Sequence, residues 1–402
     1  MPRYESGEYI VSISDAYEHA VLAVLRGLHI ALPGIASWRQ AAVNKRPTVI
    51  FDLSGHPLFF DFAVVLGRRP LGYARIAANQ LVGSPGVALE LGARQWDAES
   101  AQRKLGSVLR RRFPRAQASK PRLVCYSYPK LGLMYELSGS RVPPRVIFDV
   151  ASLDVIPERP KRPNSEGAYA WSFLESLTDN ERSRRLDRYR RHEKARRSLS
   201  ASARRKLTAA KSFPGMLDLI RFKLKKTISR TLQYCDHYDE TEPRSHHCFS
   251  LHAQEVNDYC AVATCQMVLC YYRYDYTQDD IAPDLGYSSG SGCPSDQSGG
   301  WETLTCDHLD ASYDTSPTWE KGRDEIEALH PFKSGIPGHA RACAGYSYSS
   351  WSWPAIGGAD KKLYIYDPWP WNADLKLGGA VYWEDWDTIE HTNYVTARVN
   401  CS

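Results

Sequence analysis

Four residues, met in this order along the chain, could together carry out thiol chemistry: Gln254, Cys260, His339 and Asp367. Cys260 precedes an apolar run at residues 261–269, and Asn257 or Asp258 could cap a helix that begins near it. A thiol in the first turn of a helix feels the positive end of the helix dipole, which favours the thiolate, the attacking form. Since most free cysteines are simply small buried residues, Cys260 needs catalytic partners to be a nucleophile.

A thiolate nucleophile needs a group that accepts and returns a proton, and that group needs an orienting partner. His339 follows Pro337-Gly338 and begins a predicted strand. Asp367 ends the next predicted strand, at residues 362–366, where its carboxylate could hold the imidazole. Three other histidines are weaker candidates, because they lie in predicted loops or beyond the aspartate: His308, His330 and His391.

The first 160 residues have the pattern of a compact α+β domain. Asp15 and Glu18 suit a capped helix start, and residues 16–31 have the apolar face of a helix. Short runs rich in β-branched and aromatic residues predict strands at 48–53, 58–66, 71–78, 122–128 and 145–155. Pro157, Pro160 and Pro163 then mark a boundary.

A basic segment follows, which we interpret as a linker over residues 161–234. The whole chain carries a net charge of +5, yet residues 181–230 hold eighteen Lys or Arg and four Asp or Glu. Residues 182–206 predict an exposed helix, and residues 217–228 predict an amphipathic one. Such a segment could bind nucleic acid or an acidic membrane surface. Its sparse aromatic residues favour a solvated connector, so nucleic acid is an unlikely partner.

The C-terminal part resembles the C39-like cysteine peptidases of the papain-like clan over about residues 248–395. Four segments carry the resemblance: Cys260-Ala261-Val262-Ala263, Thr277-Gln278-Asp279-Asp280-Ile281-Ala282, Pro337-Gly338-His339 with Gly345-Tyr346, and Tyr366-Asp367-Pro368. The resemblance implies that Cys260 is the nucleophile, His339 the base and acid, and Asp367 the orienting group. It also implies that Gln254 and the Cys260 N–H form the oxyanion hole.

The sequence departs from the C39-like pattern in two places. Many relatives have Cys-Gly-Pro where this chain has Cys260-Ala261-Val262, and the gap between His339 and Asp367 is lengthened by residues 346–353, which could shape a substrate cleft. In the N-terminal region, a helix is followed by Trp38-Arg39-Gln40-Ala41 and by a hairpin of the form Phe51-Asp52-Leu53-Ser54-Gly55. With these features the region more loosely resembles the pro-regions of streptopain-like peptidases. That second resemblance implies a self-inhibited zymogen, and a stable partner-binding domain is the alternative.

These observations predict an α+β protein: a papain-like catalytic domain at residues 235–402, with a helix packed on an antiparallel sheet, preceded by a separate α+β domain at 1–160 and the linker at 161–234. The predicted activity is hydrolysis of peptide bonds in a peptide or protein substrate, without a cofactor. Acyl transfer through the same thioester and an inactive peptide-binding module remain alternatives. A zinc site is a further alternative, although its spacings fit no familiar module: Cys235, His237, His246, His247 and Cys248.

The chain shows no sequence signal for membrane insertion or secretion. The most apolar early run, residues 20–32, contains Arg26 and His29 and is short for a bilayer crossing. Acidic residues precede it where a signal peptide would be basic. Ten cysteines in 402 residues are too few for a disulfide scaffold, so we expect reduced thiols and a cytoplasmic protein.

Overall fold

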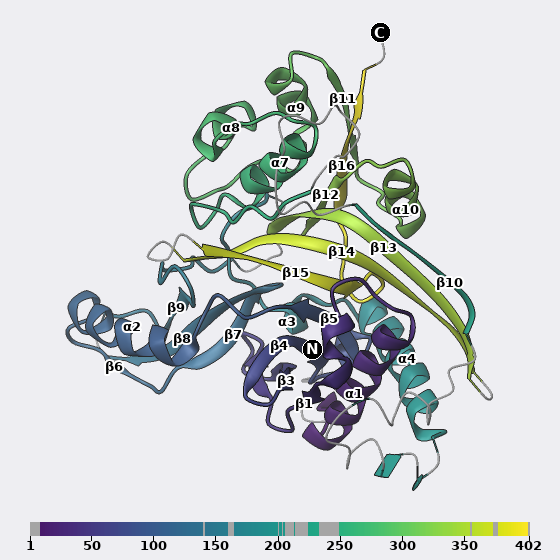
Figure 1. The fold of residues 1–402 in the computed structure, drawn as a ribbon. Coiled ribbons are helices and arrows are strands. Elements are labelled where there is room, and N and C mark those ends of the chain that lie inside the picture. Colours follow the sequence, from purple (N-terminus) through teal and green to yellow (C-terminus); the bar gives the residue numbers. More distant parts are fainter. Residues whose placement is uncertain are drawn as a thin grey trace.

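The computed structural model describes residues 9–139, 141–159, 165–199, 201–202, 204–205, 213, 224–232, 249–353, 356–372 and 377–400. Within these residues, sixteen strands form one long curved sheet that runs through the molecule, with helices on both sides (Figure 1). The path of the sheet is β11-β16-β12-β13-β14-β15-β5-β4-β3-β2-β7-β8-β6, with β1, β9 and β10 paired to its sides. The predicted α+β class is confirmed.

The described helices are α1 (Ile13–His29), α2 (Ala98–Arg112), α3 (Phe173–Ser176), α4 (Asp179–Arg197), α7 (Cys260–Tyr271), α8 (Gln278–Asp284), α9 (Ser298–Leu304) and α10 (Trp319–Glu327), with 3-10 turns η2 (Ala36–Gln40) and η3 (Gln80–Val82). The described strands are β1 (Ala42–Val43), β2 (Thr48–Phe51), β3 (Pro57–Leu66), β4 (Arg69–Ala77), β5 (Gly86–Leu91), β6 (Gln117–Ala118), β7 (Arg122–Ser127), β8 (Lys130–Ser138), β9 (Arg145–Asp149), β10 (Leu224–Thr231), β11 (Leu309–Asp314), β12 (Phe332–Ile336), β13 (His339–Trp353), β14 (Ile356–Asn372), β15 (Leu377–Asp385) and β16 (Asn393–Val399).

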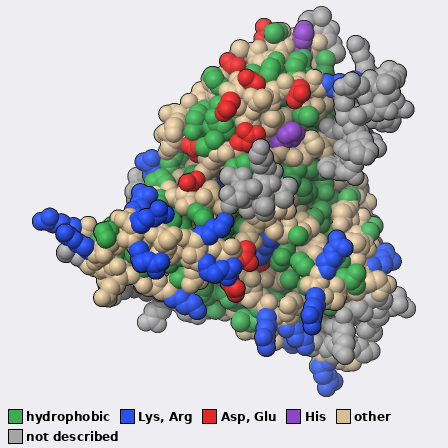
Figure 2. Space-filling view, turned by 60° about the vertical axis from the view of Figure 1, so that its left-hand side comes forward, with side chains coloured by type: hydrophobic (Ala, Val, Ile, Leu, Met, Phe, Trp, Pro, Cys, Tyr) green, Lys and Arg blue, Asp and Glu red, His purple; other side chains and the backbone are tan. Residues whose placement is uncertain are grey.

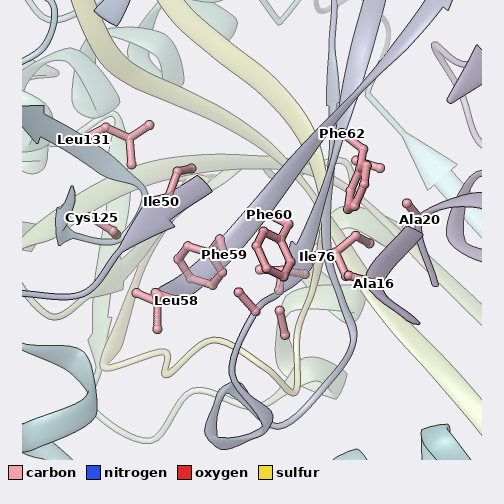
Figure 3. Close-up of a cluster of buried hydrophobic side chains, with 14 of the residues drawn as sticks. Ala16, Ala20, Ile50, Leu58, Phe59, Phe60, Phe62, Ile76, Cys125 and Leu131 are labelled. Atoms are coloured by element: carbon pink, nitrogen blue, oxygen red, sulfur yellow. The ribbon is translucent and has the colours of Figure 1, made fainter. Parts of the chain in front are cut away.

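The N-terminal half is built on the packing of α1 against β3, β4 and β5. Figure 3 shows Ala16 and Ala20 of α1 facing Phe62 and Ile76, in a core that excludes water from both elements. The predicted helix is present, but its N-cap is Ser12 rather than Asp15. The Ser12 hydroxyl accepts a hydrogen bond from the Asp15 N–H at 3.0 Å. Asp15 therefore lies in the first turn, where its negative charge interacts favourably with the positive end of the helix dipole.

The predicted strands of the N-terminal half correspond to β2, β3, β4, β7 and β9, with small shifts at their ends. β9 ends at Asp149 rather than at Val155, because the Asp149 carboxylate accepts from the N–H groups of Ala151 and Ser152 and closes a turn. The sequence analysis did not predict α2, β5 or β8.

The C-terminal part places α7 on β12, β13 and β14, as the predicted helix-on-sheet arrangement requires. Cys260 is the first residue of α7, but the predicted caps are wrong. Tyr259 is the N-cap and makes no side-chain cap bond, while the Asp258 carboxylate accepts from Tyr287 and from the Gly290 N–H. The lobe of α7, α8 and α9 lies above the sheet in Figure 1.

One prediction about the interval from His339 to Asp367 needs correction. β14 does not end at Asp367 but runs on to Asn372, with its pairing to β15 interrupted between Asp367 and Trp371. Residues 346–353 form part of β13, and their role in a substrate cleft stays a prediction. The rings of Tyr346 and Tyr348 contact Trp319 of α10, away from Asp367.

The two halves of the chain meet edge to edge. Residues 381–384 of β15 pair antiparallel with residues 88–91 of β5, and the Trp383 indole donates to the Pro33 carbonyl at 2.9 Å. This pairing makes the sheet continuous from β11 to β6. The boundaries at residues 160 and 234 stay a prediction.

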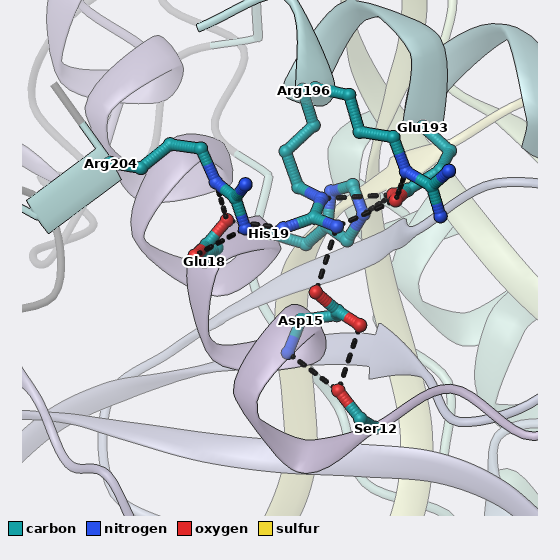
Figure 4. A network of polar contacts seen from close by, with 8 residues as sticks. Ser12, Asp15, Glu18, His19, Glu193, Arg196 and Arg204 are labelled. Carbon is teal, nitrogen blue, oxygen red and sulfur yellow. Dashed lines mark hydrogen bonds and ion pairs between the residues drawn. The ribbon is translucent and has the colours of Figure 1, made fainter. Parts of the chain in front are cut away.

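The basic segment differs from the predicted solvated connector. In α4, Arg185, Tyr189 and Arg196 are buried. Figure 4 shows Arg196 between Glu193 of its own helix and residues of α1, with which it forms ion pairs. The predicted helix over 217–228 is also wrong where the structure describes it, because residues 224–231 form β10, which pairs with β13.

Charge is unevenly spread over the surface. In Figure 2, Lys and Arg side chains cover much of the lower, N-terminal half of this face, while Asp and Glu gather on the upper half. The last turn of α2 holds Arg110, Arg111 and Arg112. No helix among the described residues is both long and apolar enough to cross a bilayer. The seven cysteines in the described part of the chain are free thiols.

Candidate active site

His339 and Asp367 lie in contact on neighbouring strands. His339 begins β13, and its Nε2 donates to the Asp367 Oδ1 over 2.8 Å. Asp367 also accepts from the Tyr382 hydroxyl at 2.7 Å and from the Trp369 N–H at 2.9 Å. Three donors fix this carboxylate, so the imidazole is held in one orientation.

The other imidazole nitrogen is left for proton exchange. His339 Nδ1 is buried and has no hydrogen-bond partner among the described residues. The main-chain N–H of Ala340, the residue next to His339, is close enough to the Cys260 thiol to oppose the rise of its pKa. The thiol at the start of α7 therefore lies beside the first residues of β13.

Gln254 lies in the same region but its side chain has a local partner. Its main-chain N–H donates to Pro368 at 3.0 Å, next to Asp367. Its side-chain Nε2 donates to the Asn257 carbonyl at 2.7 Å, while Oε1 has no partner among the described residues. The predicted oxyanion donor is thus near the predicted orienting residue, with its amide directed at the loop before Cys260.

Burial holds the thiol and the imidazole in their neutral forms. Burial raises the pKa of Cys260, and the nearby Lys130 ammonium opposes that rise only in part. Burial also lowers the pKa of His339 to about 4, against the attraction of Asp367. Burial alone would raise the pKa of Asp367, but His339, Arg341 and Tyr382 outweigh it and the pKa is lowered.

Residues from the N-terminal half cover the site. Cys260, His339 and Asp367 have no exposed surface. Lys130, the first residue of β8, is itself fully buried and donates to the carbonyl of Gly338 at 3.0 Å. The Ser127 hydroxyl donates to Pro337 at 3.3 Å. Nothing in the sequence around Lys130 distinguishes it from an exposed hairpin lysine, so the sequence analysis missed it.

The other candidate histidines have separate partners. His330 contacts Glu325 at 3.1 Å, and His308 contacts Tyr274 at 3.3 Å. His391 contacts Ser334 at 3.0 Å. Among the described residues, no three His, Cys, Asp or Glu side chains are grouped so that they could hold a metal ion. The residues of the possible zinc site, Cys235 to Cys248, lie outside the described part of the chain.

Comparison with known proteins identifies the family that the C-terminal part resembles. Residues 247–392 match the model of the Peptidase_C39 like family, which confirms that this part of the chain is C39-like. One similar solved structure is the crystal structure of a double glycine motif protease from an AMS/PCAT transporter in complex with the leader peptide. It is 17% identical, covers 39% of this chain and 96% of that chain, and has a TM-score of 0.26. No curated protein matches the chain significantly.

Proposed function

We propose that the protein is a cysteine peptidase with Cys260 as nucleophile, His339 as base and acid, and Asp367 as orienting group. The contact of 2.8 Å between His339 and Asp367 carries this proposal, because it leaves Nδ1 without a partner among the described residues, in a C39-like segment whose helix α7 begins with Cys260. A Cys–His–Asp arrangement of this kind supports nucleophilic attack on acyl groups.

In the proposed reaction, His339 Nδ1 takes the thiol proton and Cys260 Sγ forms a bond to the peptide carbonyl carbon. The C–N bond then breaks, and His339 returns the proton to the leaving amine. Water attacks the resulting thioester with His339 as base, which releases the acid and restores the thiol. Gln254 and the Cys260 N–H would hold the oxyanion once the Gln254 amide turns away from Asn257.

The covered site also supports a self-inhibited form. Residues 1–160 would act as the inhibitory domain, 161–234 as the linker and 235–402 as the catalytic domain. The complete burial of Cys260 and His339, with Lys130 bound to the Gly338 carbonyl, supports these roles for the three segments. A substrate could reach the thiol only after this cover moves.

The first prediction concerns Cys260 itself. Lys130→Met, which loosens the cover over the site, should release products from a mixed peptide library, and the same chain with Cys260→Ala added should release none, because the proposed nucleophile is gone; mass spectrometry of the library measures this. Cys260 should also alkylate slowly at neutral pH, with a rate that rises toward alkaline pH, because burial raises the pKa of its thiol.

Cys306→Ala is the matched control, since Cys306 is an exposed thiol away from the site and its loss should leave hydrolysis unchanged. Alkylation is assigned to Cys260 by peptide mapping, because Cys306 also reacts. Products that persist in Cys260→Ala, or that never form with any chain carrying Cys260, contradict the proposed function.

A further inference from the structure

A short segment of the chain, residues 165–169, lies beside the candidate site and pairs with the loop at residues 291–293, with bends at residues 165, 167 and 168. Glu166 and Cys293 exchange two main-chain hydrogen bonds of 3.1 Å each, in an antiparallel bridge. The Tyr169 hydroxyl donates to the Ser291 carbonyl at 2.6 Å. The segment therefore pairs its main chain with the loop at one antiparallel bridge, which is the kind of main-chain contact by which peptides bind to an open edge.

The loop that holds this segment is attached to the start of α7. Asp258, two residues before Cys260, accepts from the Gly290 N–H at 2.8 Å and from the Tyr287 hydroxyl at 3.0 Å. Residues 287–293 thus form one wall beside the nucleophile. A peptide paired to this wall passes close to the thiol.

The opposite wall is formed by the sheet. Lys130 Nζ donates both to the Gly167 carbonyl at 2.7 Å and to the Gly338 carbonyl at 3.0 Å. One ammonium group therefore links the segment to the residue that precedes His339. Both Lys130 and Glu166 interact electrostatically with the Cys260 thiol: the Lys130 charge lowers the pKa of the thiol and the Glu166 charge raises it.

The groove between these walls admits a main chain with little room for side chains. Gly292 has a φ of +72°, and a Cβ there would lie 1.8 Å from the Glu166 carbonyl oxygen. A Cβ on Gly167 would lie 2.9 Å from the Ser291 carbonyl oxygen. Glycine is required at 292 for the segment to approach, and the position of Gly167 favours a residue without a side chain.

The side chain of Glu166 enters a buried polar pocket made by both walls. Lys333 of β12 contacts its carboxylate at 2.8 Å, Gln297 donates to it at 2.8 Å, and Asn393 of β16 donates at 3.3 Å. All three residues are at most 3% exposed. The pocket offers a cation and two amide donors, which together match one carboxylate.

We propose that residues 165–169 occupy the substrate groove as an internal peptide, and that Lys333, Gln297 and Asn393 form a subsite for a glutamate side chain. The substrates of this class would be extended peptides with glutamate followed by glycine. This inference rests on the proposed function, because it assigns the groove beside Cys260 to the peptide substrate. Residues 165–169 then keep the enzyme inactive, because they fill the site that its substrates would use.

A buried ion pair that only anchors the connector would show the same contacts, so the test has to separate binding from anchoring. In the full-length chain, Glu166→Gln removes the charge that Lys333 holds and keeps a similar shape. Alkylation of Cys260 by iodoacetamide should become about tenfold faster or more, because a buried charge-assisted contact is lost. Glu158→Gln is the matched control, because Glu158 forms a partly exposed ion pair with Arg145, and its rate should equal wild type.

A synthetic peptide with the sequence of residues 163–171 then tests the subsite in the Glu166→Gln chain. The peptide with glutamate should slow Cys260 alkylation again, and the same peptide with glutamine should do so at least about tenfold less effectively. Lys333→Met, added to this chain, should remove the difference between the two peptides. Equal protection by both peptides overturns the subsite.

The remaining outcomes separate the two proposals. If Lys130→Met speeds alkylation of Cys260 and Glu166→Gln does not, the segment does not fill the groove and the inference fails while the proposed function stands. If no variant alkylates faster at Cys260 and no library peptide is cut, the proposed function fails. Should Glu166→Gln not fold, Gly167→Ala gives the same test, because its Cβ displaces the segment from Ser291.

Discussion

At the scale of single residues, the Asp367 carboxylate is the group on which the orientation of the candidate site depends. Its two oxygens accept from a histidine, a tyrosine and a main-chain N–H, all of them buried. Such a fully paired carboxylate holds its charge despite burial, as its lowered pKa shows. Changes at this residue and at Tyr382 therefore test orientation separately from nucleophilicity.

We expect Asp367→Asn to lower kcat/KM by less than the roughly 10⁴-fold loss known for the same change in a Ser–His–Asp triad. An amide oxygen can still accept from His339 Nε2, and orientation is only part of the role of Asp367. Tyr382→Phe removes one donor and should cost about two- to tenfold. Hydrolysis of a peptide found in the library assay measures both. An Asp367→Asn chain less active than His339→Ala would contradict this assignment.

Residue types and spacing were enough to indicate the contact between His339 and Asp367, because both residues belong to strands that are local in sequence. They could not indicate Lys130, Glu166 or Lys333. These residues meet over separations of more than thirty positions, and a lysine or glutamate that will be buried has no local signature. Only the three-dimensional structure shows that Lys333 pairs with the Glu166 carboxylate and that Lys130 donates to the Gly167 carbonyl.

At the scale of elements, α4 shows how ion pairs can anchor a helix with few apolar residues. Arg196 bonds to Glu18 of α1 and to Glu193, and Arg188 of the same helix bonds to Asp385 at 3.1 Å. The sequence analysis predicted an exposed helix because its apolar residues are few. Composition alone could not show that α1 and β15 supply matching carboxylates.

Arg196→Ala should lower the free energy of unfolding by about 1 to 3 kcal/mol, since Glu18 loses a buried charge-assisted contact while Arg204 still pairs with its carboxylate. Urea unfolding followed by fluorescence measures the change. Arg190→Ala is the matched control on the same helix, because its pair with Asp187 is exposed, and we expect a change within about 0.5 kcal/mol. Equal effects of the two substitutions would show that the α1–α4 contacts do not stabilise the fold.

β10 is a second element whose structure differs from the predicted one. The sequence LKKTI has apolar residues at helical spacing, yet residues 224–231 form a strand that pairs with residues 345–351 of β13. The spacing of apolar residues alone cannot distinguish a helix from a strand in so short a segment. The pairing partner, more than a hundred residues away in the chain, decides the outcome.

At the scale of the whole molecule, the pairing of β15 with β5 joins the halves that the sequence divides at residues 160 and 234. If a protease site is inserted between Ala210 and Lys211 and then cut, the two fragments should stay together on size-exclusion chromatography. The edge pairing and the buried contacts of Glu166 and Trp383 hold them. Elution as two separate peaks in native buffer would show that these contacts are too weak.

The same edge pairing sets a condition on synthesis. β5 leaves the ribosome with residue 91, but its partner β15 begins at residue 377. At about 5 to 20 residues per second, the edge of β5 waits roughly 15 to 60 s for its neighbour. An unpaired edge of a newly made sheet is a template for contacts with other chains. A chaperone that covers this edge, or a low concentration of nascent chains, would therefore limit such contacts until the last strands emerge.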